Sequence, residues 1–232
     1  MPSTYYEFVF MRLQNGSQVS RLQNWLEKRA MPIFQKAGYG TMAFFNMEVS
    51  AYSPAILGIV SFPSLAAMES AHGKLLADPD YAAAIAESER DEPALYREDA
   101  MLLRGTSFSP PFVPTPVGDP AHKVFELRIY ESPTQRQLGY LHDRFAGGEI
   151  EIFHKSGIFP VLYADTVFGP NQPNMAYLIP FESESHREKC WAAFRSNPDW
   201  IKIRDASIQH GGEIVRNITN MLLSPTRFSM IK

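Results

Sequence analysis

The sequence predicts an α+β fold in which two tandem ferredoxin-like βαββαβ repeats pack their antiparallel sheets into one α+β barrel. Three observations predict it: an internal repeat, one shared order of strand and helix patterns, and a sheet face in each half that only the other half can cover. The repeat is clearest where residues 33–39 (IFQKAGY) return as residues 152–158 (IFHKSGI), 119 positions later. A missed repeat would misassign the whole chain, so this feature comes first.

The same offset of 119 positions aligns the two halves without a gap from residue 7 to residue 103. Identical residues stand at many paired positions, among them Glu7/Glu126, Leu22/Leu141, Pro54/Pro173, Phe62/Phe181, Ser64/Ser183, Arg97/Arg216 and Leu103/Leu222. We therefore expect two similar domains, residues 1–109 and 123–232.

The segment between the domains, residues 110–122, is rich in proline. Proline restricts the chain and reduces the conformational entropy lost on ordering. We expect an ordered linker, with Phe112 and Val113 packed on the barrel.

Each half shows a strand, a helix, a hairpin of two strands, two further helices and a last strand. The expected strands are rich in β-branched and aromatic residues, and turn residues between the second and third favour a hairpin. They cover residues 7–11, 41–49, 56–62 and 96–103 in the first half, and 124–130, 159–168, 175–181 and 214–223 in the second.

The first helix of each half has an apolar stripe at helical spacing. We expect these helices to end at Gly38 and Gly157, each in the left-handed conformation that glycine adopts easily. Pro32 should kink or restart the first helix, and Gly147-Gly148 should break the second. The later helices begin at residues that favour the N-cap, some followed by proline: Ser64, Asp78-Pro79, Ser183 and Asn197-Pro198.

A ferredoxin-like half carries helices on only one face of its sheet, so the other face must be covered. Two fused copies offer the simplest cover, sheet against sheet. This need for cover predicts the closed barrel.

Composition limits the classes of protein to consider. Hydrophobic residues make up 45% of the chain and the net charge is −3, so nothing in the charge favours nucleic acid. The apolar runs are far shorter than the roughly 20 residues of a membrane-spanning helix, and the N-terminus lacks the pattern of a signal peptide. The single cysteine, Cys190, excludes an intrachain disulfide framework. We expect a cytoplasmic protein with no nucleic-acid partner and no membrane span.

Several short motifs resemble those of the NIPSNAP family, across nearly the whole chain outside the linker. They are FELRIY (residues 125–130), IFHKSG (152–157), NPDW (197–200) and LLSPTRFS (222–229), with weaker copies in the first half such as DPDY (78–81). The resemblance implies a dimeric α+β barrel fold, here within one chain. It implies no particular reaction, because this fold hosts many unrelated chemistries.

The candidate ligand-binding residues come from comparing the halves at matched positions, where the second half is more polar. Arg128 replaces Val9, Tyr130 replaces Met11, His154 replaces Gln35, Tyr163 replaces Phe44 and Tyr177 replaces Gly58. These residues, with Glu126 and Arg216, predict a pocket of the second repeat for a small apolar or weakly acidic molecule.

Several of these candidate residues also have a purely structural interpretation. Charged residues on one strand face are costly to bury unpaired, so Glu126, Arg128 and Arg216 are equally explained as an ion-pair network. His154 at a helix end is explained by its interaction with the helix C-terminus. His186 and Cys190 share a helix face, but two ligands do not make a metal site. We assign no metal and no cofactor.

Four functions stay open, and the sequence does not decide whether the protein is an enzyme. Small-molecule binding is the leading hypothesis. The alternatives are a cofactor-free monooxygenase or isomerase, in which His154, Tyr163 or Arg128 would handle an enolate, a haem-binding protein with a histidine ligand, and an interaction scaffold. The number of chains in the assembly is open too, a homo-oligomer included.

Overall fold

Eight strands form one closed antiparallel barrel in a computed structural model that describes residues 4–90, 93, 95–117 and 122–232. Around the barrel the order is β1-β3-β2-β8-β5-β7-β6-β4. The strands are β1 (Tyr5–Arg12), β2 (Met42–Val49), β3 (Ala55–Phe62), β4 (Arg97–Gly105), β5 (Val124–Glu131), β6 (Leu162–Phe168), β7 (Asn174–Phe181) and β8 (Asn217–Pro225). The predicted fold class is confirmed: each repeat supplies four neighbouring strands, and the two sheets close on one another.

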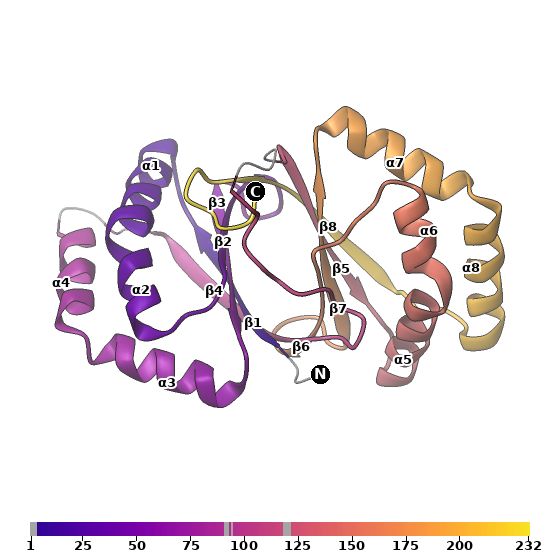
Figure 1. The fold of residues 1–232 in the computed structure, drawn as a ribbon, viewed down its shortest axis with the longest axis horizontal. Helices are drawn as coiled ribbons and strands as arrows, with labels where there is room; N and C mark the ends of the chain where they lie inside the picture. Colours follow the sequence, from indigo (N-terminus) through magenta and orange to yellow (C-terminus); the bar gives the residue numbers. More distant parts are fainter. Residues whose placement is uncertain (1–3, 91–92, 94, 118–121) are drawn as a thin grey trace.

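The helices cover the outside of the barrel on two opposite sides, one side for each repeat (Figure 1). The first repeat supplies α1 (Gly16–Trp25), α2 (Met31–Ala37), α3 (Leu65–Leu76) and α4 (Pro79–Ser88). The second supplies α5 (Gln135–Arg144), α6 (Ile150–Lys155), α7 (Glu184–Ser196) and α8 (Pro198–Gly211). In the described part of the chain, no helix combines the length and apolar character needed to cross a membrane.

The expected helix ends are confirmed. Gly38 and Gly157 have φ values of 98° and 81°, the left-handed conformation that side chains disfavour. The side chains of Ser64 and Ser183 accept hydrogen bonds from the backbone three residues on, at Ala67 and His186. Local capping chemistry therefore sets the same boundaries in both repeats.

The first helix of each repeat is interrupted by a π-helical turn, η1 (Leu26–Ala30) or η2 (Phe145–Glu149). Pro32 falls in the first turn of α2, where its missing N–H is tolerated, so an α-helix restarts at this proline after the π-helical turn. Gly148 has a φ of 144°, so the predicted break in the second repeat is present. The turn occurs in both repeats and therefore does not depend on these glycines.

The gapless offset is wrong for the last strand of each repeat. Arg12 pairs with Arg97 between β1 and β4, and its counterpart Glu131 pairs with Asn217 between β5 and β8. Asn217 is thus the match of Arg97, one position beyond the expected Arg216. The second repeat carries one extra residue before its last strand.

After its last strand, each repeat reaches across to the other. The Thr226 N–H donates to the Phe44 oxygen at 2.9 Å, and Ser229 Oγ accepts from the Phe44 N–H at 3.0 Å. The first repeat does the same to Tyr163, through Thr106 at 3.0 Å and Ser109 Oγ at 3.0 Å. This reciprocal exchange relates the repeats by a pseudo-twofold arrangement.

We expect Ser229→Ala to lower the free energy of unfolding by about 1–3 kcal/mol, the cost of a buried group left without its hydrogen bond. Ser229 is 2% exposed and also donates to the Ile231 oxygen at 2.7 Å. Urea denaturation measures the loss. Ser224→Ala, at the barrel surface, is the control, and an equal effect of both would contradict the role given to Ser229.

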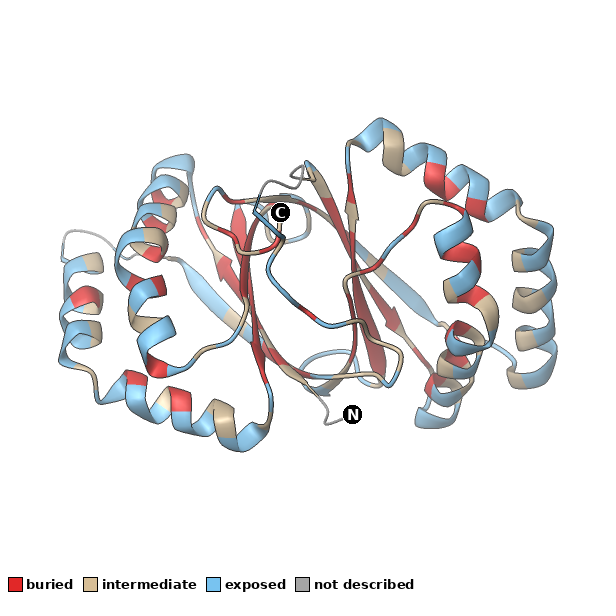
Figure 2. Cartoon of the chain, viewed as in Figure 1, coloured by how far each residue is buried: buried red, intermediate tan, exposed pale blue. Residues whose placement is uncertain are grey.

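The buried side chains form three layers, one inside the barrel and one between each sheet and its helices. Buried residues follow the strands in Figure 2. The linker crosses the open end of the barrel (Figure 1), where Phe112 is buried and meets the Tyr6 ring at 5.5 Å. Val113 is 62% exposed, so its predicted packing is wrong. The linker residues 118–121 and the first three residues of the predicted first domain lie outside the described residues.

Candidate functional site

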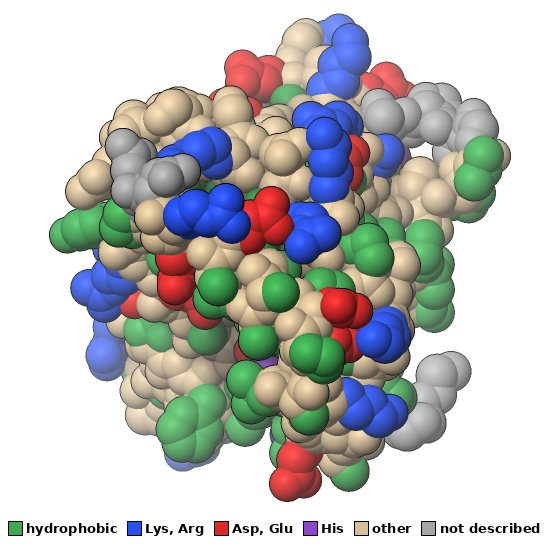
Figure 3. Space-filling view, turned by 90° about the vertical axis from the view of Figure 1, so that its left-hand side faces the viewer, with side chains coloured by type: hydrophobic (Ala, Val, Ile, Leu, Met, Phe, Trp, Pro, Cys, Tyr) green, Lys and Arg blue, Asp and Glu red, His purple; other side chains and the backbone are tan. Residues whose placement is uncertain are grey.

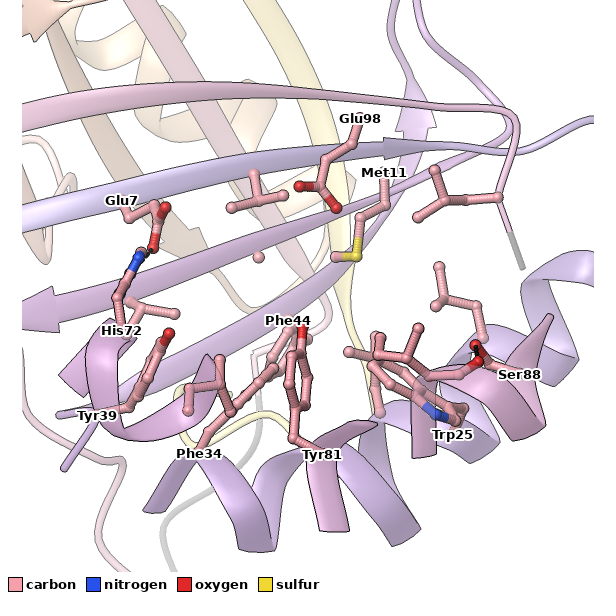
Figure 4. Close-up of a pocket in the computed structure, with 18 of the residues that line it drawn as sticks. Glu7, Met11, Trp25, Phe34, Tyr39, Phe44, His72, Tyr81, Ser88 and Glu98 are labelled. Atoms are coloured by element: carbon pink, nitrogen blue, oxygen red, sulfur yellow. Dashed lines mark hydrogen bonds and ion pairs between the residues drawn. The ribbon is translucent and has the colours of Figure 1, made fainter. Parts of the chain in front are cut away.

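A cavity of about 800 Å³ lies between the sheet and the helices of the first repeat. Figure 4 shows Glu7 and Glu98 on the strand side, opposite Tyr39, Tyr81 and Trp25 on the helix side. Most of the remaining wall is apolar. Its apolar residues include Met11, Leu26, Phe34, Phe44, Val60 and Leu75. Its volume lies in the range of small-molecule sites.

The cavity exists because this repeat has smaller side chains where the second repeat has aromatic rings. Gly58 lines it, whereas the matched Tyr177 is fully buried and its ring lies 5.6 Å from that of Phe145. A Cβ added to Gly58 would lie 3.2 Å from the Phe44 ring, so even alanine would be tight here. Tyr130 and Phe145 likewise match the smaller Met11 and Leu26.

Glu7 and His72 form the polar centre of the cavity. His72 Nε2 lies 3.2 Å from Glu7 Oε2, and the two side chains are 35% and 18% exposed. The Tyr39 ring stacks on the imidazole, with centroids 5.5 Å apart and planes at 5°. The stack fixes the imidazole plane, so one ring nitrogen stays directed at the carboxylate.

Glu89 and Glu98 add two further carboxylates at the exposed rim of the cavity. Partial burial of the carboxylate, and then the negative charge of Glu7, raise the pKa of Glu98. Burial also raises the pKa of Tyr39, and the negative charge of Glu7 raises it further. The described residues lining this cavity include no lysine or arginine, so the site is acidic.

The side of the molecule that carries the first repeat shows basic and acidic side chains interspersed (Figure 3). On this face no single sign of charge dominates. The acidic character therefore belongs to the cavity itself rather than to the surface around it.

In the second repeat, the carboxylate that matches Glu7 is enclosed by cations. Glu126 is 0% exposed and accepts from Arg128 at 2.6 Å, Arg187 at 2.7 Å and the Trp191 indole at 2.8 Å. Burial alone would raise the pKa of Glu126, but the hydrogen bonds from Arg187, Trp191 and Arg128 hold it below its ordinary value. The structure thus joins Glu126 and Arg128 in one ion-pair network, which leaves out Arg216.

Tyr130 also belongs to this group, because its hydroxyl accepts from Arg128 at 3.1 Å. Arg128 and Tyr130 line a smaller cavity of about 340 Å³ beside β5 and α7. The two residues predicted from the sequence to line a pocket therefore do line a cavity. The larger cavity, however, lies in the first repeat.

The remaining candidates lie apart. Tyr163 and Tyr177 are buried among aromatic rings, and their hydroxyls find no partner among the described residues. His154 is exposed and stacks on Phe159 at 5.1 Å. Arg216 is exposed just before β8. Neither His154 nor Arg216 lines either cavity.

Sequence reasoning did not identify His72, Tyr39 or Glu98 as site residues. His72 and Glu7 are 65 positions apart, and the match of His72 is a tryptophan, so no motif joins them. A signal was nevertheless present in the comparison of the halves. The same matched positions, compared for side-chain volume instead of polarity, show that the first repeat has room to spare.

Comparison with known proteins agrees with this architecture. No curated protein matches the sequence. A candidate monooxygenase from Lactobacillus acidophilus is 10% identical, with a TM-score of 0.59 over 96% of this chain and 94% of its own. A candidate chlorite dismutase is 10% identical, with a TM-score of 0.58 over 99% and 97%. Likeness at this identity establishes the fold alone.

A NIPSNAP family protein of unknown function from Agrobacterium tumefaciens is 20% identical and aligns with 46% of this chain and 92% of its own, with a TM-score of 0.40. The NIPSNAP family model itself matches twice, at residues 6–110 and 125–230. The second match is one residue longer than the first, as the shifted last strand requires. The chain belongs to the NIPSNAP family, as two tandem copies of its domain closed into one barrel.

Proposed function

We propose that the cavity of the first repeat binds a small, mainly apolar molecule that carries a positive charge or a hydrogen-bond donor. The observation that supports this is the cavity itself, with about 800 Å³ of largely apolar space lined by three carboxylates, those of Glu7, Glu89 and Glu98. Apolar pockets with a few convergent polar groups are the usual form of small-molecule sites.

The charge of the lining selects among ligands. Glu7 lies beside the imidazole of His72, and Glu89 and Glu98 are the other two carboxylates of the wall. A carboxylate or enolate ligand would meet like charges here. An ammonium group would instead gain a charge-assisted hydrogen bond. A weakly acidic ligand, expected from the sequence for the second repeat, therefore does not suit this cavity.

Three probes of the same shape and different charge test the proposal: naphthylmethylamine, naphthylmethanol and naphthoate. We expect the amine to bind most tightly at neutral pH, the alcohol more weakly and the acid least, as measured by titration calorimetry. The order follows from the carboxylates of the lining, while the naphthyl ring is common to all three probes. Equal affinities, or tightest binding of naphthoate, would contradict the acidic site.

A steric variant locates the binding. Leu75 lines the cavity and is matched by Phe194 in the second repeat. Leu75→Phe should therefore fill part of the cavity without changing the backbone conformation. We expect it to weaken all three probes together. The control is Leu138→Phe, in the core of the second repeat, which should leave the probes unaffected. Unchanged binding in Leu75→Phe would place the probes elsewhere.

A further inference from the structure

The smaller cavity, of about 340 Å³, lies at the place in the second repeat where the first repeat has its large one. Cations and aromatic rings line it, where the first repeat offers carboxylates. The cations are Arg128, Arg187 and Arg195, and the rings are Tyr130, Trp191, Phe194 and Trp200. The two repeats thus present sites of opposite character.

The local charges leave a positive surplus. Arg128 and Arg187 share one buried carboxylate, Glu126, at 2.6 and 2.7 Å. Glu188, at the rim, pairs with Arg187. Arg195 is exposed, and no acidic side chain among the described residues pairs with it. Three guanidinium groups therefore face two carboxylates.

Arg128 has one hydrogen-bond donor that no described residue uses. Its side chain is 13% exposed, and its guanidinium lies 4.6 Å from the centre of the Trp191 ring. One amino group donates to Glu126 and the other to Tyr130. Its Nε–H is buried and has no acceptor among the described residues. A buried donor without a partner is costly, and a bound oxygen would remove that cost.

We propose that this cavity is a second binding site, which takes the carboxylate of a small aromatic acid. The carboxylate is held by Arg128 and Arg195, and the ring packs among Trp191, Phe194 and Trp200. Guanidinium groups bind carboxylates with strong, directed hydrogen bonds. The volume is at the lower end for ligand sites, which limits the occupant to about one ring. This proposal does not depend on the function proposed for the first repeat.

The test uses the whole chain and three probes: phenylacetate, phenylethanol and inorganic phosphate. Phenylacetate is expected to bind more tightly than either of the others, since only it supplies both the carboxylate and the ring. Titration calorimetry gives the affinities, and tryptophan fluorescence reports on Trp191 and Trp200.

Arg195→Ala is the main variant, because Arg195 is exposed and its loss leaves no buried charge. It should weaken phenylacetate about tenfold or more, as expected for a lost hydrogen bond to a charged group. Arg128→Gln should weaken it further, with circular dichroism checking that the chain is folded. Arg136→Ala removes the same charge from the exposed face of α5 and should leave the affinity unchanged.

Several results with the phenylacetate site would overturn the proposal. They are no binding of phenylacetate at millimolar concentration, equal binding of phosphate, and equal losses in Arg195→Ala and Arg136→Ala. The naphthylmethylamine affinity should not change in Arg195→Ala. If both probes lost affinity together, the two cavities would not be separate sites and the proposal would fail.

Discussion

Glu126→Ala is expected to lower the free energy of unfolding by about 3–5 kcal/mol, the cost of leaving buried charges without their partner. Glu126 is 0% exposed and holds two arginines and the Trp191 indole. Without this carboxylate, the guanidinium groups of Arg128 and Arg187 would lose their shared ion-pair partner. Urea or thermal denaturation, monitored by circular dichroism, measures the loss.

The duplication supplies the matched control. Glu7 occupies the same position in the first repeat, is 18% exposed and pairs, among the described residues, with the His72 imidazole. Glu7→Ala should therefore cost less than about 1 kcal/mol, as for exposed pairs. Similar losses for the two variants would mean that the arginines of the second repeat do not need Glu126.

Glu7→Gln is expected to weaken naphthylmethylamine by about 10–150-fold while leaving naphthylmethanol within about threefold. The range corresponds to the 1.5–3 kcal/mol of a hydrogen bond to a charged group. Glutamine keeps an acceptor for His72, so the cavity should keep its shape. Glu213→Gln, on the exposed surface of the second repeat, is the control. Equal effects on the amine and the alcohol would contradict a charge-based site.

The pH dependence of amine binding should report the protonation of Glu98. Because partial burial and the charge of Glu7 raise the pKa of Glu98, amine binding should begin to weaken, as the pH falls, above the range in which an ordinary glutamate takes up a proton. Glu98→Gln should remove this first phase. A raised pKa also means that the folded state binds the proton more tightly, so the stability contributed is present at low pH and is lost as the pH rises through that pKa. Glu98→Gln should therefore raise the melting temperature at neutral pH and not at acid pH.

Local patterns in the sequence were enough for the fold. Helix ends at Gly38 and Gly157, N-caps at Ser64 and Ser183, and the strand patterns all follow from near neighbours in the chain. The barrel followed from the need to cover one face of each sheet. The shifted last strand was missed, although residues 102–109 (LLRGTSFS) align with residues 222–229 (LLSPTRFS) at an offset of 120 rather than 119.

The site was predicted less well, for a physical reason. Polarity at matched positions favoured Tyr163 and Tyr177, but both rings are buried among other aromatic rings. A cavity is set by volumes on elements far apart in sequence, which no local pattern reports. Arg128 was found because it replaces Val9 in the comparison of the halves, and because a charged residue on a strand face is costly to bury unpaired.

The way the barrel closes has a consequence for how the chain folds. The edge strand β2 of the first repeat pairs with β8, with Phe45 opposite Pro225, and the other edge strand, β4, pairs with β6. A first repeat that folded before the second had emerged would be an open four-stranded sheet with two unpaired edges and an apolar inner face. Such edges recruit foreign strands. We therefore expect the nascent chain to be most prone to aggregation after its first half is complete, until its own second half covers the edges.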